Sequence, residues 1–533
     1  MRIVSIKEMK EVEDLCDKEF HFNESLLTEN VGIQAAAEID KDLKSRSIEG
    51  EILFLIGKGS NGADGLATAR HLVIKGYRCR AFLLFAESEC SSELLTQQKM
   101  ASSFNVFTNV IETSNQLIGY IEQAGNAVIV DAIFGTGVQL PLSNSIYEII
   151  DYVNSNSERV FSIDIATGVQ GDSGFTQGNA IFADLTLAIG YPKLGHYVAN
   201  GLKHSGSIKV LNVGIPKSLE DQGDKYLLRP EHMIDLVGMR DKFADKKRYG
   251  HALVLGGSHG LTGAVALASN ACLNVGVGLV TVATWEPQYQ EMIYRLVPEV
   301  LTGYLPLDTS KWSNLIKDLN KYSSIVIGPG LARSSRARRL VLEVLNNYDG
   351  PVIIDADAIN VLNYIEDKEI LSHRNAPTVL TPHLGEFARF TGVDFEELKN
   401  NPVNMLKNLV NTVNCTVILK GPCTYLGTSD GNVYFNYSPN DGMATGGVGD
   451  VLAGILGGLL AQESSLKSSD SLINKYNTFN RTVAVGVYAH SLAGVYAAKE
   501  YGVRSMSAES IVNCLSKAFQ DLDDDFDKLI VGK

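Results

Sequence analysis

Short apolar runs alternate with amphipathic segments along most of this 533-residue chain. Nine runs are rich in valine and isoleucine, and all but 278–284 end in a short stretch containing glycine, aspartate or lysine: residues 51–59, 126–137, 159–168, 183–190, 251–258, 278–284, 324–330, 351–358 and 416–422. Continuous apolar runs of this length are typical of strands buried on both faces, and helical patterns between them indicate parallel sheets. We therefore predict two α/β domains, the first a Rossmann-like three-layer α/β/α domain, with ligands at the carboxyl ends of the strands.

The strand pattern stops between residues 214 and 247, where the chain is charged and irregular. A chain of 533 residues is also too long for one hydrophobic core, so two or more domains are expected. We predict a first domain over residues 1–216, a connector over 217–244 and a second domain over 245–533.

Charge and cysteine usage narrow the class of protein. A net charge of −14 at pH 7 argues against a broad surface for nucleic acid or acidic membrane. The seven cysteines are scattered and form no CxxC motif, which favours a reducing compartment over a disulfide framework. Charges interrupt the N-terminal segment where a signal peptide has its apolar core, and the longest apolar run, 451–461, is too short to span a bilayer. We expect a cytoplasmic protein that acts on small anionic molecules, without nucleic-acid or membrane partners.

One glycine-rich segment near the C-terminus holds the first candidate for catalysis. Residues 440–460 read NDGMATGGVGDVLAGILGGLL. Glycines let consecutive backbone N–H groups turn toward an anion, and the start of the next helix adds its positive dipole end. Gly446, Gly447 and Gly449 therefore predict a phosphate or oxyanion nest, with Asp450 as the base for an attacking hydroxyl. The alternative is a tight turn in which Asp450 is only the helix N-cap.

The first half contains a similar strand, glycine loop and helix. Residues 57–72 read GKGSNGADGLATARHL, and residues 57–62 match GxGxxG, but Asn61 and Asp64 add oxygen ligands that a simple pyrophosphate cradle would not need. Asp131, Asp164 and Thr167 supply further oxygens after two other strands. Hard oxygen ligands suit a weakly held cation, and one firmly placed carboxylate suits proton transfer. Alternatively, Asp131 and Asp164 cap the turns that follow them.

The motifs GKGSNGADG, VDAIFGTG and DIATG resemble, in this order, the N-terminal domain of the bifunctional NAD(P)H-hydrate repair enzymes. The resemblance covers most of residues 1–215 and implies epimerisation of hydrated NADH and NADPH, with a bound potassium ion. The K⁺ ligands implied by position are Asn61, Asp131 and Thr167. The implied substrate contacts are Ser60, Asn61, Gly62, Ala63, Asp64, Gly135, Thr136, Gly137, Val138, Gln139, Leu140, Pro141 and Asp164. Ser60, Ala63 and the Ala166–Thr167 pair depart from the family pattern of Asn, Gly and Pro–Ser.

A second series of motifs spans nearly all of residues 245–500. It consists of the segment 249–284 followed by VIGPGL, IIDADAIN, VLTPHLGE, VILKGPCT and ATGGVGDVLAG. These motifs resemble the dehydratase domain of the same enzymes, which implies a ribokinase-like α/β fold for the second half. By position, Ala264, Gly330, His383 and Asp450 are the implied contacts to the hydrated dinucleotide. Lys420, Gly421, Pro422, Cys423, Thr424 and Gly449 are the implied ADP/AMP site.

Four polar residues in these motifs have two readings each without the resemblance. The Lys420 ammonium either reaches a phosphate or is solvated at its strand end. His383 either contacts a ligand or is a loop histidine with satisfied hydrogen bonds. Asp355 and Asp357 either organise a cation or a ribose or cap a turn.

The resemblance implies a bifunctional enzyme, an isomerase and a lyase. The first domain interconverts the R and S epimers of NAD(P)HX, with Asp164 as the proton carrier. The second dehydrates the S epimer, with Asp450 as the base, using ADP with Mg²⁺ and giving AMP and phosphate. We expect NADHX or NADPHX and ADP as the small-molecule partners, and a homo-oligomer.

Two other classes of function remain open at this point. A ribokinase-like small-molecule kinase shares the GGVGD loop, but TPHLGE, KGPCT and the attached first domain argue against it. A non-catalytic binding module is an alternative for residues 1–215, against which Asn61, Asp131, Asp164 and the hydroxyl of Thr167 favour catalysis.

Overall fold

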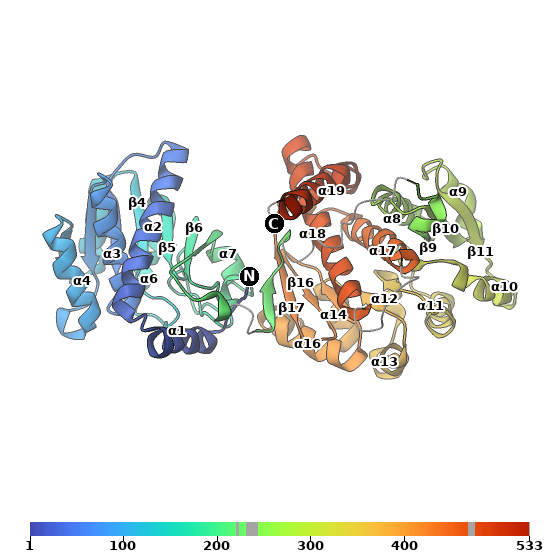
Figure 1. The fold of residues 1–533 in the computed structure, drawn as a ribbon, viewed down its shortest axis with the longest axis horizontal. Coiled ribbons are helices and arrows are strands. Elements are labelled where there is room, and N and C mark those ends of the chain that lie inside the picture. Colours follow the sequence, from blue (N-terminus) through green and yellow to red (C-terminus); the bar gives the residue numbers. More distant parts are fainter. Residues whose placement is uncertain (220–222, 231–242, 467–474, 532–533) are drawn as a thin grey trace. The chain divides into compact units, whose positions relative to one another are not determined.

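The structure, a computed structural model, describes residues 1–219, 223–230, 243–466 and 475–531 and divides into two compact units (Figure 1). Unit 1 comprises Met1–Lys225 and Lys399–Asn401, and unit 2 comprises Tyr226–Leu398 and Pro402–Lys533. The division falls within the range 217–244 predicted as a connector. Residues 220–222 and 231–242 of that connector lie outside the described residues.

Unit 1 is built on a seven-stranded sheet of order β3-β2-β1-β4-β5-β6-β7, in which every strand pair is parallel. Its helices and strands are α1 (Ile6–Phe20), α2 (Glu24–Arg46), β1 (Ile52–Ile56), α3 (Ser60–Ile74), β2 (Cys79–Leu83), α4 (Ser92–Ser103), β3 (Phe107–Val110), α5 (Ser114–Ala124), β4 (Ala127–Ala132), α6 (Asn144–Asn156), β5 (Ser157–Ile163), β6 (Leu185–Ile189), α7 (Gly201–His204) and β7 (Ser207–Leu211).

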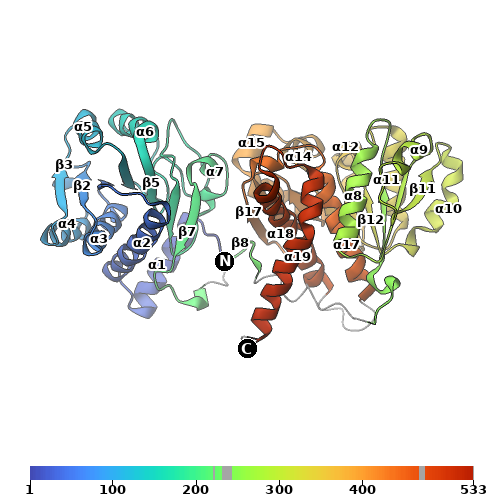
Figure 2. The ribbon, with the colours of Figure 1, turned by 90° about the horizontal axis from the view of Figure 1, so that it is seen from above.

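Apolar side chains cover both faces of this sheet. Because successive residues of a strand point to opposite faces, β1 sends Phe54 into a cluster with α2 and α3, and Leu53 and Leu55 into a second cluster with α5 and α6. Figure 2 shows α5 and α6 on one side of the sheet and α2 and α3 on the other. The three-layer α/β/α arrangement predicted for this half is confirmed.

Unit 2 is built on a ten-stranded sheet of order β11-β10-β9-β12-β13-β14-β15-β16-β17-β8, parallel from β11 to β15 and antiparallel from β15 to β17. The elements from residue 225 onward are β8 (Lys225–Leu227), β9 (His251–Leu255), α8 (Thr262–Asn274), β10 (Leu279–Trp285), α9 (Tyr289–Ile293), β11 (Leu301–Leu305), α10 (Trp312–Lys317), β12 (Ser324–Ile327), α11 (Ser335–Asn347), β13 (Val352–Ile354), α12 (Asp357–Val361), α13 (Tyr364–His373), β14 (Thr378–Leu380), α14 (Leu384–Thr391), α15 (Phe395–Asn400), α16 (Pro402–Val413), β15 (Thr416–Leu419), β16 (Cys423–Gly427), β17 (Val433–Tyr437), α17 (Val448–Leu466), α18 (Lys475–Tyr501) and α19 (Ala508–Val531).

Helix α17 is the central helix of unit 2 and packs against α8 and α18 (Figure 1). Its glycines permit this close approach. A Cβ at Gly454 would lie 2.0 Å from the carbonyl oxygen of Ala268 on α8, and one at Gly457 would lie 2.4 Å from Val326 on β12. The small-residue segment predicted as a helix is therefore confirmed as a buried one, held directly against the sheet.

All nine predicted strand runs contain a strand, so the α/β class is confirmed for both halves. Within the range predicted as a connector, residues 225–227 form β8, which joins the edge of the second sheet beside β17. Among the described residues, none of the helices is both long and apolar enough to cross a membrane.

On topological grounds alone, the strand orders predict one ligand crevice in each sheet. In unit 1 the chain order reverses between β1 and β4, and in unit 2 it reverses between β9 and β12. Loops that leave the carboxyl ends of two such strands diverge, and ligands bind in the crevice between them. Gly135 and Gly330 lie in the loops after β4 and β12, and Asn61 and Ala264 lie in the first turns of α3 and α8, the helices that follow β1 and β9. All four are predicted site residues.

Candidate active sites

In unit 2, glycines bring the loops after β9 and β12 together at the reversal point. Gly330 has a φ of +59°, and a Cβ there would lie 2.4 Å from the carbonyl oxygen of Leu261, one residue before α8. Ala264 lies in the first turn of α8 and is half-buried. The structure thus places Gly330 beside the N-terminus of α8, the helix that carries Ala264.

Asp355 and Lys420 form a buried ion pair at the ends of β13 and β15. The Nζ of Lys420 donates to Oδ1 of Asp355 at 2.8 Å, and the hydroxyl of Thr381 donates to the same oxygen at 2.6 Å. The Asp355 side chain is 1% exposed and that of Lys420 is 19% exposed. Burial by itself lowers the pKa of Lys420, but the nearby carboxylates, Asp355 foremost, leave the pKa raised, so the ammonium is charged.

The Lys420 ammonium also lies against the start of α17. A Cβ at Gly449 would stand 3.1 Å from Nζ of Lys420, so the glycine lets the ammonium approach the helix backbone closely. The preceding Gly447 has a φ of +91°, and Gly446 is exposed with open space where a Cβ would be. This geometry is a glycine turn that opens to solvent, at a helix N-terminus with a cation beside it.

Asp450 lies in the first turn of α17 and is partly exposed. Burial, together with the carboxylates of Asp355, Glu386 and Asp357, raises its pKa from 3.8 to about 7, although Lys420 opposes the shift. Because Lys420 already donates to Asp355, its charge only partly offsets the surrounding negative charge. A carboxyl with a pKa near 7 exchanges protons readily at neutral pH, as a general base requires.

His383 is the N-cap of α14, at the end of β14. Its Nδ1 accepts hydrogen bonds from the N–H groups of Gly385 and Glu386, at 3.0 and 3.3 Å, so the neutral ring carries its proton on Nε2. The carboxylate of Glu386 accepts the His383 N–H in return, at 2.9 Å. Burial lowers the pKa of His383. A backbone bridge pairs His383 with Lys420, so the predicted site residues of β14 and β15 lie side by side.

The predicted nucleotide segment after β15 is not uniform in exposure. Gly421 and Pro422 are exposed and Thr424 is partly exposed, whereas Cys423 is 1% exposed. Burial strongly raises the pKa of the Cys423 thiol. Any contact from position 423 to a nucleotide would therefore need a change from this conformation, while its neighbours are accessible.

In unit 1, the loop after β1 presents an amide without partners. Both Oδ1 and Nδ2 of Asn61 are buried, and neither has a hydrogen-bond partner among the described residues. Ser60 is exposed and donates to Glu24 at 2.8 Å. A buried amide that forms no protein hydrogen bond is costly, which marks Asn61 as a group that awaits a ligand.

The next three predicted contact residues turn toward the core instead. Ala63 is 0% exposed and belongs to the apolar cluster beneath α2 and α3, so its side chain does not face the loop. Asp64 is 7% exposed, and burial raises its pKa well above the ordinary value. Gly62 is also buried, and a Cβ there would lie only 2.3 Å from the carbonyl oxygen of Gly57. The side chain of Ala63 therefore cannot make the substrate contact implied for that position.

Asp131, the last polar residue of β4, is fully buried and accepts four hydrogen bonds. Its Oδ1 accepts from the Thr167 hydroxyl at 2.6 Å and from the N–H of Ile133 at 3.3 Å. Its Oδ2 accepts from the N–H of Thr167 and from the hydroxyl of Ser162, both at 2.8 Å. These four donors are neutral, and burial raises the pKa of Asp131. The network fixes the loop after β5 against the end of β4.

Asp164 follows β5 with a φ of +67°, a strained value for a residue other than glycine. Its Oδ1 accepts from the buried ammonium of Lys193 at 2.5 Å. Its Oδ2 lies toward the other loop, because a Cβ at Gly135 would be 3.3 Å from this oxygen and 3.4 Å from Cγ of Asn61. Asn61, Gly135 and Asp164 therefore converge, as predicted for one site. Of the remaining loop 136–141, Gly137, Gln139 and Pro141 are exposed, and Thr136, Val138 and Leu140 are half-buried.

Sequence reasoning missed Lys193 and His196 in unit 1 and Glu386 and His490 in unit 2. Lys193 and His196 belong to PKLGH, just after the run 183–190, so a signal was present in their position at a strand end. His490 on α18 contacts the carbonyl oxygen of Val448 at 3.1 Å and supports the start of α17. Burial lowers the pKa of His490 to about 4, so it is neutral there.

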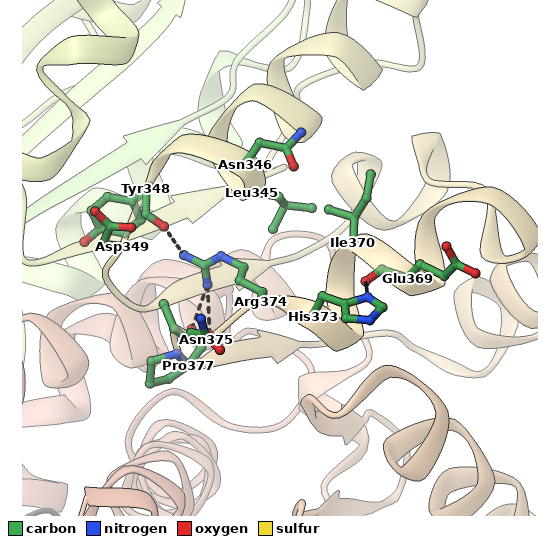
Figure 3. Close-up of a pocket in the computed structure, with 11 residues that line it drawn as sticks. Leu345, Asn346, Tyr348, Asp349, Glu369, Ile370, His373, Arg374, Asn375 and Pro377 are labelled. Atoms are coloured by element: carbon green, nitrogen blue, oxygen red, sulfur yellow. Dashed lines mark hydrogen bonds between the residues drawn. The ribbon is translucent and has the colours of Figure 1, made fainter.

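Two surface hollows lie apart from the predicted site residues. One, of about 630 Å³, is lined by residues of α11, α13 and the following loop (Figure 3). Its Arg374 donates to the carbonyl oxygens of Tyr348, Gly350, Ala376 and Pro377, which ties two loops together and leaves little capacity for an anion. The other, of about 720 Å³, lies around residues 43–51 and 76–80. Neither hollow is lined by any of the predicted site residues.

Two family descriptions match this chain. Residues 24–195 match "YjeF-related protein N-terminus", and residues 252–517 match "NAD(P)H-hydrate dehydratase". The two matched ranges contain every residue predicted for the epimerase and dehydratase sites.

Similar proteins match over the whole chain. The bifunctional NAD(P)H-hydrate repair enzyme Nnr of Moorella thermoacetica is 31% identical over 100% of this chain and 99% of its own length. The enzyme of the same name from Thermofilum pendens is 31% identical over 99% of this chain and 98% of its own length. Among solved structures, an ADP/ATP-dependent NAD(P)H-hydrate dehydratase of Bacillus subtilis, co-crystallised with ATP and Mg²⁺, is 27% identical over 56% of this chain and 98% of its own, with a TM-score of 0.47.

Proposed function

The chain belongs to the family of bifunctional NAD(P)H-hydrate repair enzymes, and from this premise we propose how each unit performs one of the two reactions. Unit 1 interconverts the R and S epimers of hydrated NADH or NADPH. Unit 2 dehydrates the S epimer to NAD(P)H. The observation that supports this division most is Asp450, a carboxyl with a pKa raised to about 7 at a glycine turn beside the Lys420 cation.

The dehydration is proposed to proceed through a phosphorylated intermediate. The hydrated ring carries a hydroxyl on C6, and hydroxide is a poor leaving group near neutral pH. Asp450 takes the proton of this hydroxyl while the C6 oxygen of the substrate attacks the terminal phosphoryl group of the nucleotide. Phosphate then leaves with the C–O bonding electrons, assisted by the ring nitrogen, and loss of the C5 proton restores the double bond. The overall products are NAD(P)H, phosphate and the shortened nucleotide.

The nucleotide is proposed to be ADP, which gives AMP. Lys420 and the N–H groups of residues 446–449 would contact its phosphates, and the exposed Gly421 and Pro422 with Thr424 would border the adenosine portion. Mg²⁺ would accompany the nucleotide and neutralise its phosphates. The substrate would lie toward Ala264, Gly330 and His383, at the crevice between β9 and β12.

The epimerisation is proposed to occur between Asn61, Gly135 and Asp164. Inversion at C6 requires the C–O bond to open with help from the ring nitrogen and water to add on the opposite face. Oδ2 of Asp164 faces the Gly135 loop and is the oxygen that would carry the proton. The exposed residues Gly137, Gln139 and Pro141 would contact the rest of the dinucleotide.

A potassium ion is proposed to be held by Asn61, Asp131 and Thr167. Two observations support this choice of residues: Asn61 has a buried Oδ1 without a partner, and Asp131 is a fully buried carboxylate with four neutral donors. A monovalent cation matches oxygen ligands of this kind and would offset the buried charge. When bound, it would supply positive charge to this part of the site.

The remaining expectations concern the setting of the protein. All seven cysteines are free thiols, which fits a reducing compartment such as the cytoplasm. The partners we propose are NADHX or NADPHX and ADP, with a homo-oligomer as the assembly.

The decisive experiment is an incubation of the purified chain with both epimers of NADHX, ADP, Mg²⁺ and K⁺, with the absorbance of regenerated NADH as readout. Complete conversion by the wild type is expected, with loss of all conversion in Asp450→Asn. Asp164→Ala should stop after the S epimer is consumed. If the wild type forms no NADH, the proposed function is wrong, and a stable phosphorylated product would then indicate a small-molecule kinase. If Asp164→Ala converts both epimers, unit 1 acts only as a binding module.

A further inference from the structure

Beyond Asp164 itself, we propose that Lys193 is a positioning residue of the epimerase site. Lys193 holds one carboxylate oxygen of Asp164, so that the other oxygen is presented to the substrate. The proposal rests on the proposed function of unit 1 and deepens it, because it names a residue that determines the orientation of the proton carrier.

Lys193 is a buried lysine whose ammonium has a defined geometry. Its side chain is 1% exposed, and Nζ donates to Oδ1 of Asp164 at 2.5 Å and to the carbonyl oxygen of Ile189 at 2.9 Å. A lysine is almost never fully buried unless it is paired. Because Ile189 ends β6, the ammonium is anchored to the sheet on one side and to Asp164 on the other.

A neutral histidine fixes the loop that carries Lys193. The N–H of Lys193 donates to Nδ1 of His196 at 3.1 Å, which leaves the ring proton on Nε2. Nε2 of His196 then donates to the backbone carbonyl oxygen of Asp164 at 2.9 Å. Burial lowers the pKa of His196 to about 4, so this tautomer persists through neutral pH. Asp164 is therefore held at its backbone by His196 and at its side chain by Lys193.

These contacts divide the two oxygens of Asp164 into different roles. Oδ1 accepts from Lys193 and from the N–H of Ile189 at 3.3 Å. Oδ2 has the Gly135 loop opposite it, where a Cβ would approach to 3.3 Å. The strained φ of +67° at Asp164 is maintained by this surrounding network, as expected where strain serves a site. Proton transfer is thus assigned to Oδ2 alone.

The charges around Asp164 explain why a lysine occupies this position. Asp64 on α3 and Glu13 on α1 are both influenced by the charge of Asp164, and burial raises the pKa of each of them. Carboxyl groups thus face Asp164 from two packed helices, together with Glu24 on α2, which also acts on Asp64 and Glu13. The Lys193 ammonium is the cation in contact with Asp164, and without it the oriented carboxylate would be repelled from this position.

A purely structural ion pair is the competing explanation, and steady-state kinetics separates the two. The epimerase rate is measured without ADP, by chromatographic separation of the R and S epimers of NADHX. The dehydratase rate of the same chain is measured on the S epimer with ADP. Because the second reaction belongs to unit 2, it reports whether each variant chain is folded and active there.

The test compares Lys193→Met, Lys193→Arg, Asp164→Asn and the double variant Asp164→Asn/Lys193→Met. Lys209→Met is the matched control, because Lys209 is a half-exposed lysine of unit 1 that forms a surface ion pair with Glu38. We expect Lys193→Met to lower the epimerase kcat by roughly 10- to 100-fold with KM nearly unchanged, because a misplaced catalytic group loses rate more than binding. Lys193→Arg, which keeps the cation and its donors, should recover part of kcat.

The double variant tests whether Lys193 acts through Asp164. If it does, the double variant is no slower than Asp164→Asn, and the dehydratase rates of all variants match the wild type. An epimerase kcat of Lys193→Met within about twofold of wild type overturns the proposal, and so does a double variant slowed by the full product of the two single effects. If Lys193→Met does not fold, the same comparison is made with Lys193→Gln, which also removes the charge. Absence of epimerase activity in the wild type refutes the proposed function of unit 1 instead.

Discussion

The raised pKa of Asp450 predicts how the dehydratase rate depends on pH. Asp450 acts as a base, so only its ionised form is active, and its pKa lies at about 7. Activity should therefore be lost as the pH falls through 7 and should level off above 8. An unperturbed aspartate, with a pKa near 3.9, would give a flat rate over the same range.

The structure fixes the size of this effect. Near pH 6, about one Asp450 in eleven is ionised, and near pH 8 about ten in eleven are, so kcat/KM should rise about tenfold between them. The rise of the Asp450 pKa from 3.8 to about 7 corresponds to roughly 4 kcal/mol against the ionised form. Burial is the largest cause, and Asp355 is the largest contribution from another charge.

The assay is kcat/KM for the S epimer at subsaturating substrate, from about pH 5.5 to 8.5, because this ratio reports the free enzyme. Asp355→Asn, which keeps the shape of the side chain, removes that charge and frees Lys420, so its acidic limb should move to lower pH. A wild-type profile that is flat between pH 6 and 8 refutes the assignment of Asp450 as the base. An acidic limb that stays in place in Asp355→Asn refutes the stated cause of the shift.

Three further results are expected. Asp450→Asn should raise the Tm at pH 8 but not near pH 4. The pKa of Asp450 is higher in the folded than in the unfolded state, so its ionisation lowers the stability of the fold progressively as the pH rises from 4 to 7. Asparagine does not ionise and avoids this loss. Asn61→Ala should leave the Tm unchanged or higher, because the Asn61 amide has no hydrogen-bond partner among the described residues. The epimerase activity of this variant, measured over a range of K⁺ concentrations, should be lost. Thr167→Val should lower stability by roughly 1.5–3 kcal/mol in denaturant titrations and weaken K⁺ activation, because Asp131 loses its 2.6 Å hydroxyl donor.

Burial explains which strands the sequence pattern could predict. The nine predicted runs are strands in the interior of the sheets, where both faces are covered and the apolar run is continuous. The four edge strands, β3, β7, β11 and β8, all lay outside the predictions. β7 has alternating exposed and half-buried residues, and β11 is largely exposed, so neither has the composition of a buried strand. The pattern thus fails at the edges of the sheets, and it also missed the interior strands β2, β14, β16 and β17, of which β14 is buried but only three residues long.

The same reasoning separates the site residues that were predicted from those that were missed. Asp131, Asp164 and Lys420 follow continuous apolar strands, so their place at the carboxyl edge was readable from the sequence. Lys193 follows the predicted run 183–190 by three residues, so its place near a strand end was readable, but its contact with Asp164 joins residues 29 positions apart. Such a contact depends on how a loop folds back over the sheet, which periodicity does not encode.

The two catalytic candidates are both partly or largely buried carboxyl groups, and each has a lysine nearby, but the lysines are bonded differently. Lys193 donates directly to Asp164, which holds that carboxylate in one orientation. Lys420 donates to Asp355 instead, so Asp450 feels its charge without a hydrogen bond to it and keeps a pKa near 7. The arrangement at Asp450 suits a base that must take up a hydroxyl proton, because its pKa stays near 7. The arrangement at Asp164 suits a carboxylate that must be held in one orientation, because Lys193 bonds to it directly. The partner of each lysine, more than its presence, therefore determines what the neighbouring aspartate can do.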